Sequence, residues 1–209
     1  AAHMKPRDFE GTNEEYLVMI SEELFPILKS HNLANRIDSF VEKSTFSPEE
    51  IANYYQKAKN LGFDLTVHAD QFTTGGSEVA AKFGAKSADH LEASGKKEID
   101  ILAKSETIAV ALPGASIGLG CAFTPARKIL DQGGSLAIGS DWNPGSAPMG
   151  DLITQASILA TFEKLSTAEV LAGLTFRAAA ALGLEDRGVL RAGLLADFNL
   201  FPTSDYREI

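Results

Sequence analysis

The chain has 209 residues, of which 44% are hydrophobic and 22% charged, and its formal net charge is −9. These proportions are typical of a globular protein with one large or two small domains. The acidic balance argues against a nucleic acid or an anionic membrane as partner, because no basic surface is available for phosphate contacts. The single cysteine, Cys121, fits a reducing cytoplasm. The sequence shows neither a leader pattern, which would indicate export, nor an apolar run of roughly 18 residues, which would indicate membrane insertion.

In chain order, helical and strand patterns alternate. Thr12 with Glu15 forms a capping box before the first helix, and Ser47 opens the second, which Gly62 ends. Helices are predicted over residues 12–31, 47–60, 77–83, 95–104, 124–132, 150–163 and 166–181. Strands are predicted over residues 36–42, 65–69, 88–91, 107–114 and 135–140.

The predicted strands are near-continuous apolar runs rather than alternating ones. That pattern is typical of a parallel sheet buried on both faces. Five strand–helix units predict either an open doubly wound sheet or part of a (β/α)8 barrel. The segment LLADFNLF, residues 194–201, predicts a further strand of different character.

Three of these strands end in a side chain that can bind a metal ion. The runs LTVHAD, KSADHLE and SLAIGSDWNPG end at His68, His90 and Asp141. In parallel α/β proteins the active-site residues lie at the carboxyl ends of the strands, so these three residues predict one shared site. Imidazole and carboxylate are ordinary ligands of zinc and iron.

Each of these residues also has a purely structural interpretation. His68 could be a buried histidine bonded to a backbone carbonyl, and His90 could form an ion pair at the strand end with Asp89. Asp141 could simply cap the Asn-Pro-Gly turn that follows it. The polar loop DQFTTGG after His68 favours a binding role, because binding residues commonly lie on such loops.

Seven segments, taken together, resemble the imidazolonepropionases of the amidohydrolase superfamily: AAHMKP, VHADQ, GGSE, KSADHLE, VALPG, SDWNPGSAP and GVLRAGLLADFNLF. The resemblance covers essentially the whole chain. It implies strands four to eight of a (β/α)8 barrel over residues 1–185. Residues 186–209 would then be the C-terminal segment of a small composite β-domain.

The resemblance also implies roles for individual residues. Zinc or iron would be held by His68 and Asp141. The catalytic residues implied by the resemblance are His90, Asp141 and Gln71. The substrate would be contacted by His3, Gln71, Asn143, Gly145 and Ser146.

The sequence departs from the family in one important respect. The superfamily holds its metal with a His-x-His pair as well, and the four histidines of this chain, at positions 3, 31, 68 and 90, form no such pair. We therefore expect the chain to resemble the C-terminal portion of a longer, cytoplasmic and homodimeric enzyme. As given, it would be incomplete for activity.

The reaction implied by the resemblance is hydrolysis of a cyclic amide in histidine degradation, from 4-imidazolone-5-propanoate to N-formimino-L-glutamate. An alternative is deamination of a cyclic amidine with the same metal chemistry. Gln71 disfavours it, because an amide side chain cannot shuttle a proton. A further alternative is an inactive fragment that lacks half of the metal site.

Overall fold

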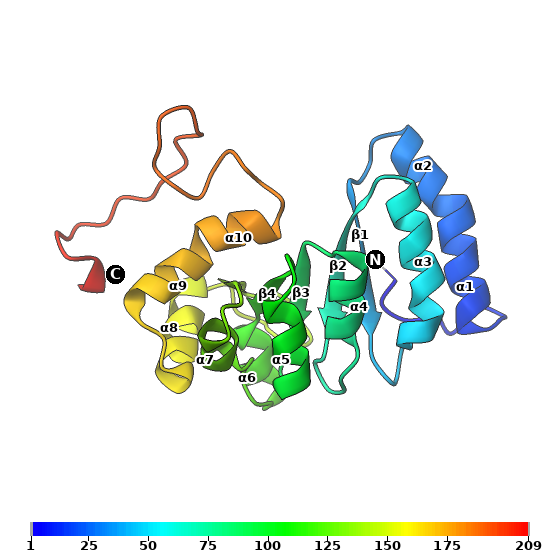
Figure 1. Cartoon of the computed structure of the whole chain (residues 1–209), viewed down its shortest axis with the longest axis horizontal. Coiled ribbons are helices and arrows are strands. Elements are labelled where there is room, and N and C mark those ends of the chain that lie inside the picture. Colours follow the sequence, from blue (N-terminus) through cyan, green and yellow to red (C-terminus); the bar gives the residue numbers. More distant parts are fainter. Residues whose placement is uncertain (1, 209) are drawn as a thin grey trace.

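The computed structural model describes residues 2–208 (Figure 1). Its centre is a single parallel sheet in which each strand pairs with the next one in the sequence. The strands are β1 (Arg36–Val41), β2 (Asp64–Ala69), β3 (Ser87–His90), β4 (Ile108–Ala111) and β5 (Leu136–Ile138). A doubly wound sheet would reverse its strand order at a switch point, whereas a (β/α)8 barrel does not. The structure is therefore part of a barrel, and among residues 2–208 the sheet does not close.

The helices follow the strands in the order expected of repeated strand–helix units. They are α1 (Asn13–Met19), the π-helix η1 (Ile20–Leu24), α2 (Phe25–Ser30), α3 (Pro48–Asn60), α4 (Gly76–Phe83), α5 (Lys96–Ala103), α6 (Pro113–Leu119), α7 (Ala126–Asp131), α8 (Leu152–Glu163), α9 (Thr167–Leu174), α10 (Phe176–Ala181) and the short 3₁₀ helix η2 (Tyr206–Glu208). Among the residues described, no helix is both long enough and apolar enough to cross a bilayer.

The two helix starts predicted at Thr12 and Ser47 are confirmed. Both capping boxes form: the Thr12 and Ser47 side chains each accept from a backbone N–H three residues later. The first predicted helix is nevertheless divided by η1. Pro26 cannot donate to the carbonyl four residues before it, and the wider π-turn directly upstream accommodates the missing bond.

Three sequence predictions are wrong. The helix predicted over residues 166–181 is divided at Thr175, whose backbone is not helical, into α9 and α10. Residues 113–119 form α6 rather than the end of a strand, because Pro113 opens a helix that Gly120 closes in the left-handed region. The C-terminal strand over residues 194–201 does not form either. A strand needs a partner, and no strand within residues 2–208 pairs with this segment, whose Leu200 side chain is 87% exposed. Figure 1 shows the chain after α10 extending away from the sheet.

The two faces of the sheet differ in what they carry. Side chains such as Ile37, Leu65 and Ala88 are buried, on the side where α3 and α4 pack. The alternate side chains of the same strands, including Asp38 and His68, face the other way and are only partly buried. This second face corresponds to the inside of a barrel, and it carries polar groups that can act on a ligand.

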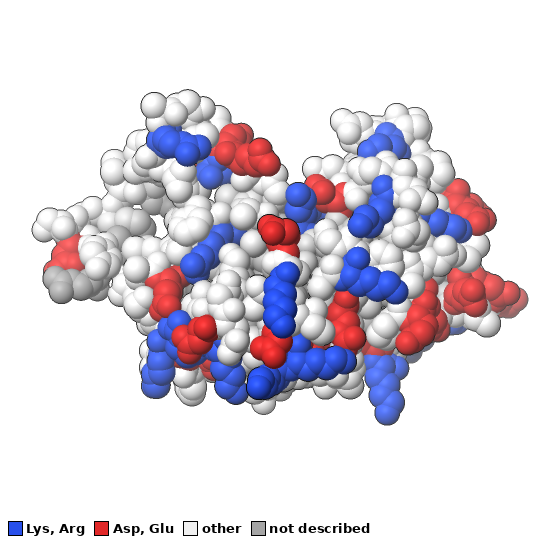
Figure 2. Space-filling model, viewed as in Figure 1, with Lys and Arg blue, Asp and Glu red and all other residues white. Residues whose placement is uncertain are grey.

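The amino ends of the strands are covered by α10. Nη1 of Arg36, at the start of β1, donates to the carbonyl of Ala181 at 2.8 Å. The carboxyl ends of the strands lie at the opposite edge of the sheet. On the molecular face shown in Figure 2, positive and negative side chains are interspersed, as the mixed composition leads one to expect.

Candidate functional site

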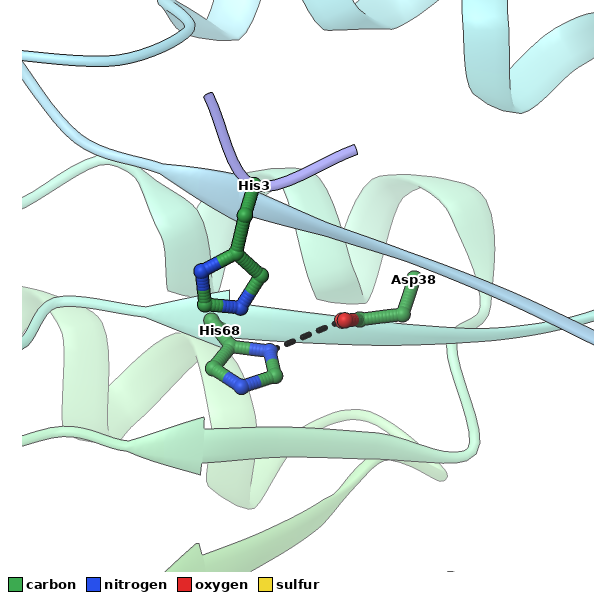
Figure 3. A group of neighbouring side chains, drawn as sticks. All are labelled: His3, Asp38 and His68. Carbon is green, nitrogen blue, oxygen red and sulfur yellow. Dashed lines mark hydrogen bonds and ion pairs between the residues drawn. The ribbon is translucent and has the colours of Figure 1, made fainter. Parts of the chain in front are cut away.

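His68 lies at the centre of a cluster of ring and carboxylate groups on the inner face of the sheet (Figure 3). Its Nδ1 donates to Oδ1 of Asp38, on the neighbouring strand β1, at 2.9 Å. The ring of His3 lies edge-on to it, with centroids 4.5 Å apart. Burial alone would lower the pKa of His68. The hydrogen bond and charge of Asp38, followed by Asp89 and Asp141, together raise that pKa above its ordinary value.

His3 is held beside this cluster by backbone pairing. The backbone N–H of Ala2 donates to the carbonyl of Asp38, and the N–H of Phe40 donates to the carbonyl of Ala2. The His3 ring then stacks on Phe40, with centroids 5.2 Å apart. Partial burial and the adjacent His68 lower the pKa of His3, which favours a neutral imidazole.

His90 approaches His68 from the other side, at the end of β3. The two ring centroids are 5.3 Å apart, and His90 is buried. His90 and Leu91 both have positive φ, 83° and 73°, a conformation that costs energy for residues other than glycine. Hydrogen bonds from Thr124 Oγ1 to the His90 carbonyl, at 2.5 Å, and from the Leu91 N–H to Ala69 hold this turn in place. Strain held by surrounding bonds is typical of functional positions.

Glu92 is a buried carboxylate that the sequence analysis missed. Its Oε1 lies 3.7 Å from Nδ1 of His90 and accepts from the hydroxyl of Ser116 at 2.9 Å. Nδ1 of His90 and Oε2 of Glu92 are buried and have no hydrogen-bond partner. Such atoms are rare, so a small movement that brings the two groups into a hydrogen bond would satisfy both.

Asp141 enters the cluster from the loop after β5. Its φ is +57°, and its Oδ2 accepts from the hydroxyl of Ser146 at 3.0 Å. The loop is closed by an antiparallel bridge between Asn143 and Ala147, and Oδ1 of Asn143 accepts from the Gly145 N–H at 2.8 Å. The predicted contact residues Asn143, Gly145 and Ser146 therefore share one rigid turn with Asp141.

Gln71 is buried in the loop between β2 and α4, three residues after His68. Among residues 2–208, no hydrogen bond joins its side chain to His68, His90 or Asp141. Its position is instead fixed through Glu42, at the end of β1. The Glu42 carboxylate accepts from the backbone N–H of Phe72 at 2.8 Å and from the Thr73 hydroxyl at 2.5 Å.

Asp89 pairs in register with His68 and lies on the same inner face. Burial raises the pKa of Asp89 from 3.8 to about 6, against the opposing charge of His68. Its Oδ1 is enclosed and has no partner. Asp89, Asp38 and Asp141 thus place three carboxylates around one imidazole.

The structure brings together most of the predicted site residues. His68, His90 and His3 have neighbouring rings, and the charge of Asp141 reaches His68. One donor atom each from His3, Asp38 and His68 lies within 4.8 Å of the others. Imidazole and carboxylate groups at such spacing fit a divalent metal ion. Asp38, Glu42 and Glu92 were missed, although Asp38 interrupts an apolar strand just as Asp89 does.

The chain was compared with known proteins. A model of the amidohydrolase family matches residues 15–208. The chain is 40% identical to the imidazolonepropionase of Deinococcus deserti and 42% identical to that of Deinococcus radiodurans, in each case over 208 residues that cover 99% of this chain and 51% of the relative. The chain thus spans about half the length of the curated relatives it matches.

Solved structures show the same fold. An adenosine deaminase from Xanthomonas campestris with bound zinc superposes with a TM-score of 0.72 at 20% identity, over 94% of this chain and 50% of the other. An amidohydrolase from a Sargasso Sea environmental sample gives a TM-score of 0.70 at 21% identity, over 94% and 49%. At this level of identity the likeness concerns the fold alone.

Proposed function

Because this chain belongs to the amidohydrolase family, we propose that it forms part of an imidazolonepropionase and acts in the hydrolysis of 4-imidazolone-5-propanoate to N-formimino-L-glutamate. The relatives that match it over 99% of its length carry that name. The observation that carries the proposal is the meeting of His68 and His90, with ring centroids 5.3 Å apart, at the carboxyl ends of neighbouring strands. The substrate is a small molecule of histidine degradation.

His68 and Asp141 would hold the metal ion, zinc or iron. When bound, such an ion supplies a water molecule whose pKa is lowered from about 16 toward 7. Two ligands are fewer than the three or four that a stable site uses. No His-x-His pair occurs in these 209 residues. The remaining ligands would come from protein outside this chain's sequence.

The chain's own residues would then carry out the proton transfers and hold the ring. Asp141 accepts the proton of the attacking water, and its Ser146 hydrogen bond fixes the carboxylate for that task. His90 donates a hydrogen bond to the oxygen that gains charge when the amide carbonyl is attacked. Gln71 offers a paired donor and acceptor to the imidazolone ring.

The substrate's propanoate would be bound by the loop after β5 and by His3. The Asn143 side-chain oxygen is already occupied by the Gly145 N–H, so its amide NH2 group remains to donate. The turn also presents backbone amides of the kind that bind anions.

Three further proposals concern the organisation of the protein. Residues 1–185 form the partial barrel, and residues 186–209 belong to a small β-domain, which accounts for the unpaired segment at 194–201. The enzyme works in the cytoplasm, for which a single free cysteine is suited. It is a homodimer, as the family resemblance implies.

A chimera tests the function. This chain replaces the matching half of the Deinococcus radiodurans relative, and loss of the imidazolone's ultraviolet absorbance is followed with zinc or iron present. We expect turnover that falls at least ~10²-fold in the Asp141→Asn chimera, because the variant lacks a base and a charged ligand. A folded chimera without turnover, or with turnover unchanged by Asp141→Asn, would contradict the proposal.

A further inference from the structure

Asp38 approaches His68 in a way that fixes which ring nitrogen is free. Asp38 pairs in register with Thr66, two residues before His68, so its carboxylate lies toward the amino end of the strand. From there its Oδ1 contacts Nδ1 of His68 at 2.9 Å. Figure 3 shows the other ring nitrogen on the side of the ring away from Asp38.

A carboxylate can only accept a hydrogen bond, so Nδ1 of a neutral His68 must carry the proton. The lone pair of that imidazole is then on Nε2. Metal-binding histidines commonly have their second nitrogen held by a carboxylate in this manner, which sets the ring orientation and makes the free nitrogen a better ligand. His68 and Asp38 are both partly buried, with side-chain exposures of 21% and 19%, so water competes only weakly for the bond.

A rival interpretation makes Asp38 itself a metal ligand. His3, Asp38 and His68 together place three donor atoms within 4.8 Å. In that arrangement the ion would lie between the Asp38 carboxylate and the His68 ring, where the hydrogen bond from Nδ1 to Oδ1 is now formed. Within residues 2–208 no hydrogen bond occupies Nε2 of His68, whereas Nδ1 bonds Asp38, so the structure favours the first arrangement.

We propose that Asp38 is a positioning residue that locks His68 in the Nδ1–H tautomer and directs Nε2 toward the metal. The inference rests on the proposed function only for the role of His68 as a ligand. The tautomer itself is a property of the metal-free chain.

The tautomer can be measured directly. The 209-residue chain is labelled with ¹⁵N in histidine only and kept metal-free at an alkaline pH where all imidazoles are neutral. Magic-angle-spinning ¹⁵N spectra, which tolerate assembly of the chain, distinguish protonated from unprotonated ring nitrogens. The His68→Gln variant assigns the His68 signals among the four histidines.

We expect His68 to be in the Nδ1–H form in the wild-type chain. Asp38→Ala should change the ratio of the two tautomers by about tenfold or more, because a hydrogen bond to a charged group is lost. Asp38→Asn should keep the Nδ1–H form, since its amide oxygen still accepts. Asp89→Asn is the matched control: it removes a carboxylate beside His68 on the other neighbouring strand and should leave the tautomer unchanged. Two results would overturn the proposal: an Nε2–H tautomer of His68 in the wild-type chain, or a change in the tautomer ratio that is as large in Asp89→Asn as in Asp38→Ala.

Zinc affinity of the chimera gives a second readout that needs no turnover. Asp38→Ala should weaken zinc binding by about 10–100-fold, and Asp38→Asn should restore most of it. If Asp38 were a ligand, Asn would restore little, because an amide is a poor substitute for a carboxylate on zinc. A chimera that binds zinc with the expected Asp38 dependence but lacks turnover would contradict the proposed function and leave this inference standing.

Discussion

The imidazole rings of His68 and His90, from the neighbouring strands β2 and β3, have centroids 5.3 Å apart and planes inclined by 45°. The two side chains reach this position differently. His68 projects from the inner face of its strand, whereas His90 is turned inward by a backbone with positive φ. Two imidazoles at this distance can serve one bound molecule, one as a ligand and the other as a proton donor. The proposed site is therefore at the carboxyl end of the sheet, where both side chains lie.

Asp89 should make the stability of the metal-free chain depend on pH. Burial raises the pKa of Asp89 from 3.8 in its ordinary state to about 6 in the fold. A carboxyl group whose pKa is higher in the fold than in the unfolded chain stabilises the fold when both states are protonated, which for Asp89 is below pH 3.8. This stabilisation is lost as the pH rises through the pKa of the folded state, about 6. The difference corresponds to about 3 kcal/mol. Asp89→Asn should accordingly unfold at higher urea concentration at pH 7.

The advantage of Asp89→Asn should shrink as the pH falls toward 4, where Asp89 of the wild type is itself neutral. Urea titrations at several pH values give the comparison. Asp64→Asn, at an exposed position at the start of β2, serves as the control and should lack this dependence. A constant difference between Asp89→Asn and the wild type from pH 4 to 7 would mean that Asp89 stays ionised throughout.

Glu42 should determine how firmly the loop with Gln71 is held. Glu42 is 4% exposed, and its carboxylate accepts hydrogen bonds from Phe72 and Thr73. Glu42→Ala should cost about 2–4 kcal/mol in unfolding free energy, because charge-assisted bonds are lost and buried donors remain. In the chimera it should raise KM more than it lowers kcat. Lys43→Ala, at the exposed next position, is the control. If Lys43→Ala and Glu42→Ala had equal effects, the Glu42 carboxylate would not be what holds the loop.

The isolated chain should bind zinc weakly. His68 and Asp141 supply two ligands, fewer than a stable site needs. Metal analysis after dialysis should find far less than one zinc per chain, while the chimera should retain one. One tightly held zinc in the isolated chain would require a different ligand set, for which His3, Asp38 and His68 are the candidates.

The outer strands of the sheet should make the isolated chain associate. Among residues 2–208, β1 pairs on its outer side only through two isolated bridges, Ala2 with Ser39 and Phe46 with Val41, and β5 pairs with β4 alone. Unpaired strand edges recruit other strands. Light scattering of the purified chain should show oligomers, and a monodisperse monomer with one cooperative melting transition would be the contrary result.

The sequence predicted the strands because buried parallel strands are unbroken apolar runs, as LTVHA is. It missed α6 because PGASIGL continues such a run, and only Pro113 marks the change. His68, His90 and Asp141 were predicted as site residues from their places at strand ends, and their roles stay predictions. Asp38, Glu42 and Glu92 were not predicted, because their roles depend on which strands and loops lie side by side, and a single sequence does not state that pairing.

The most direct test of a single metal site at His68, His90 and Asp141 is anomalous X-ray scattering at the zinc edge from crystals of the chimera. We expect one zinc peak, with Nε2 of His68 and the Asp141 carboxylate as ligands at about 2.0–2.2 Å, and His90 facing it without coordinating. A zinc peak between His3 and Asp38, bonded to Nδ1 of His68, would contradict both the proposed site and the role given to Asp38.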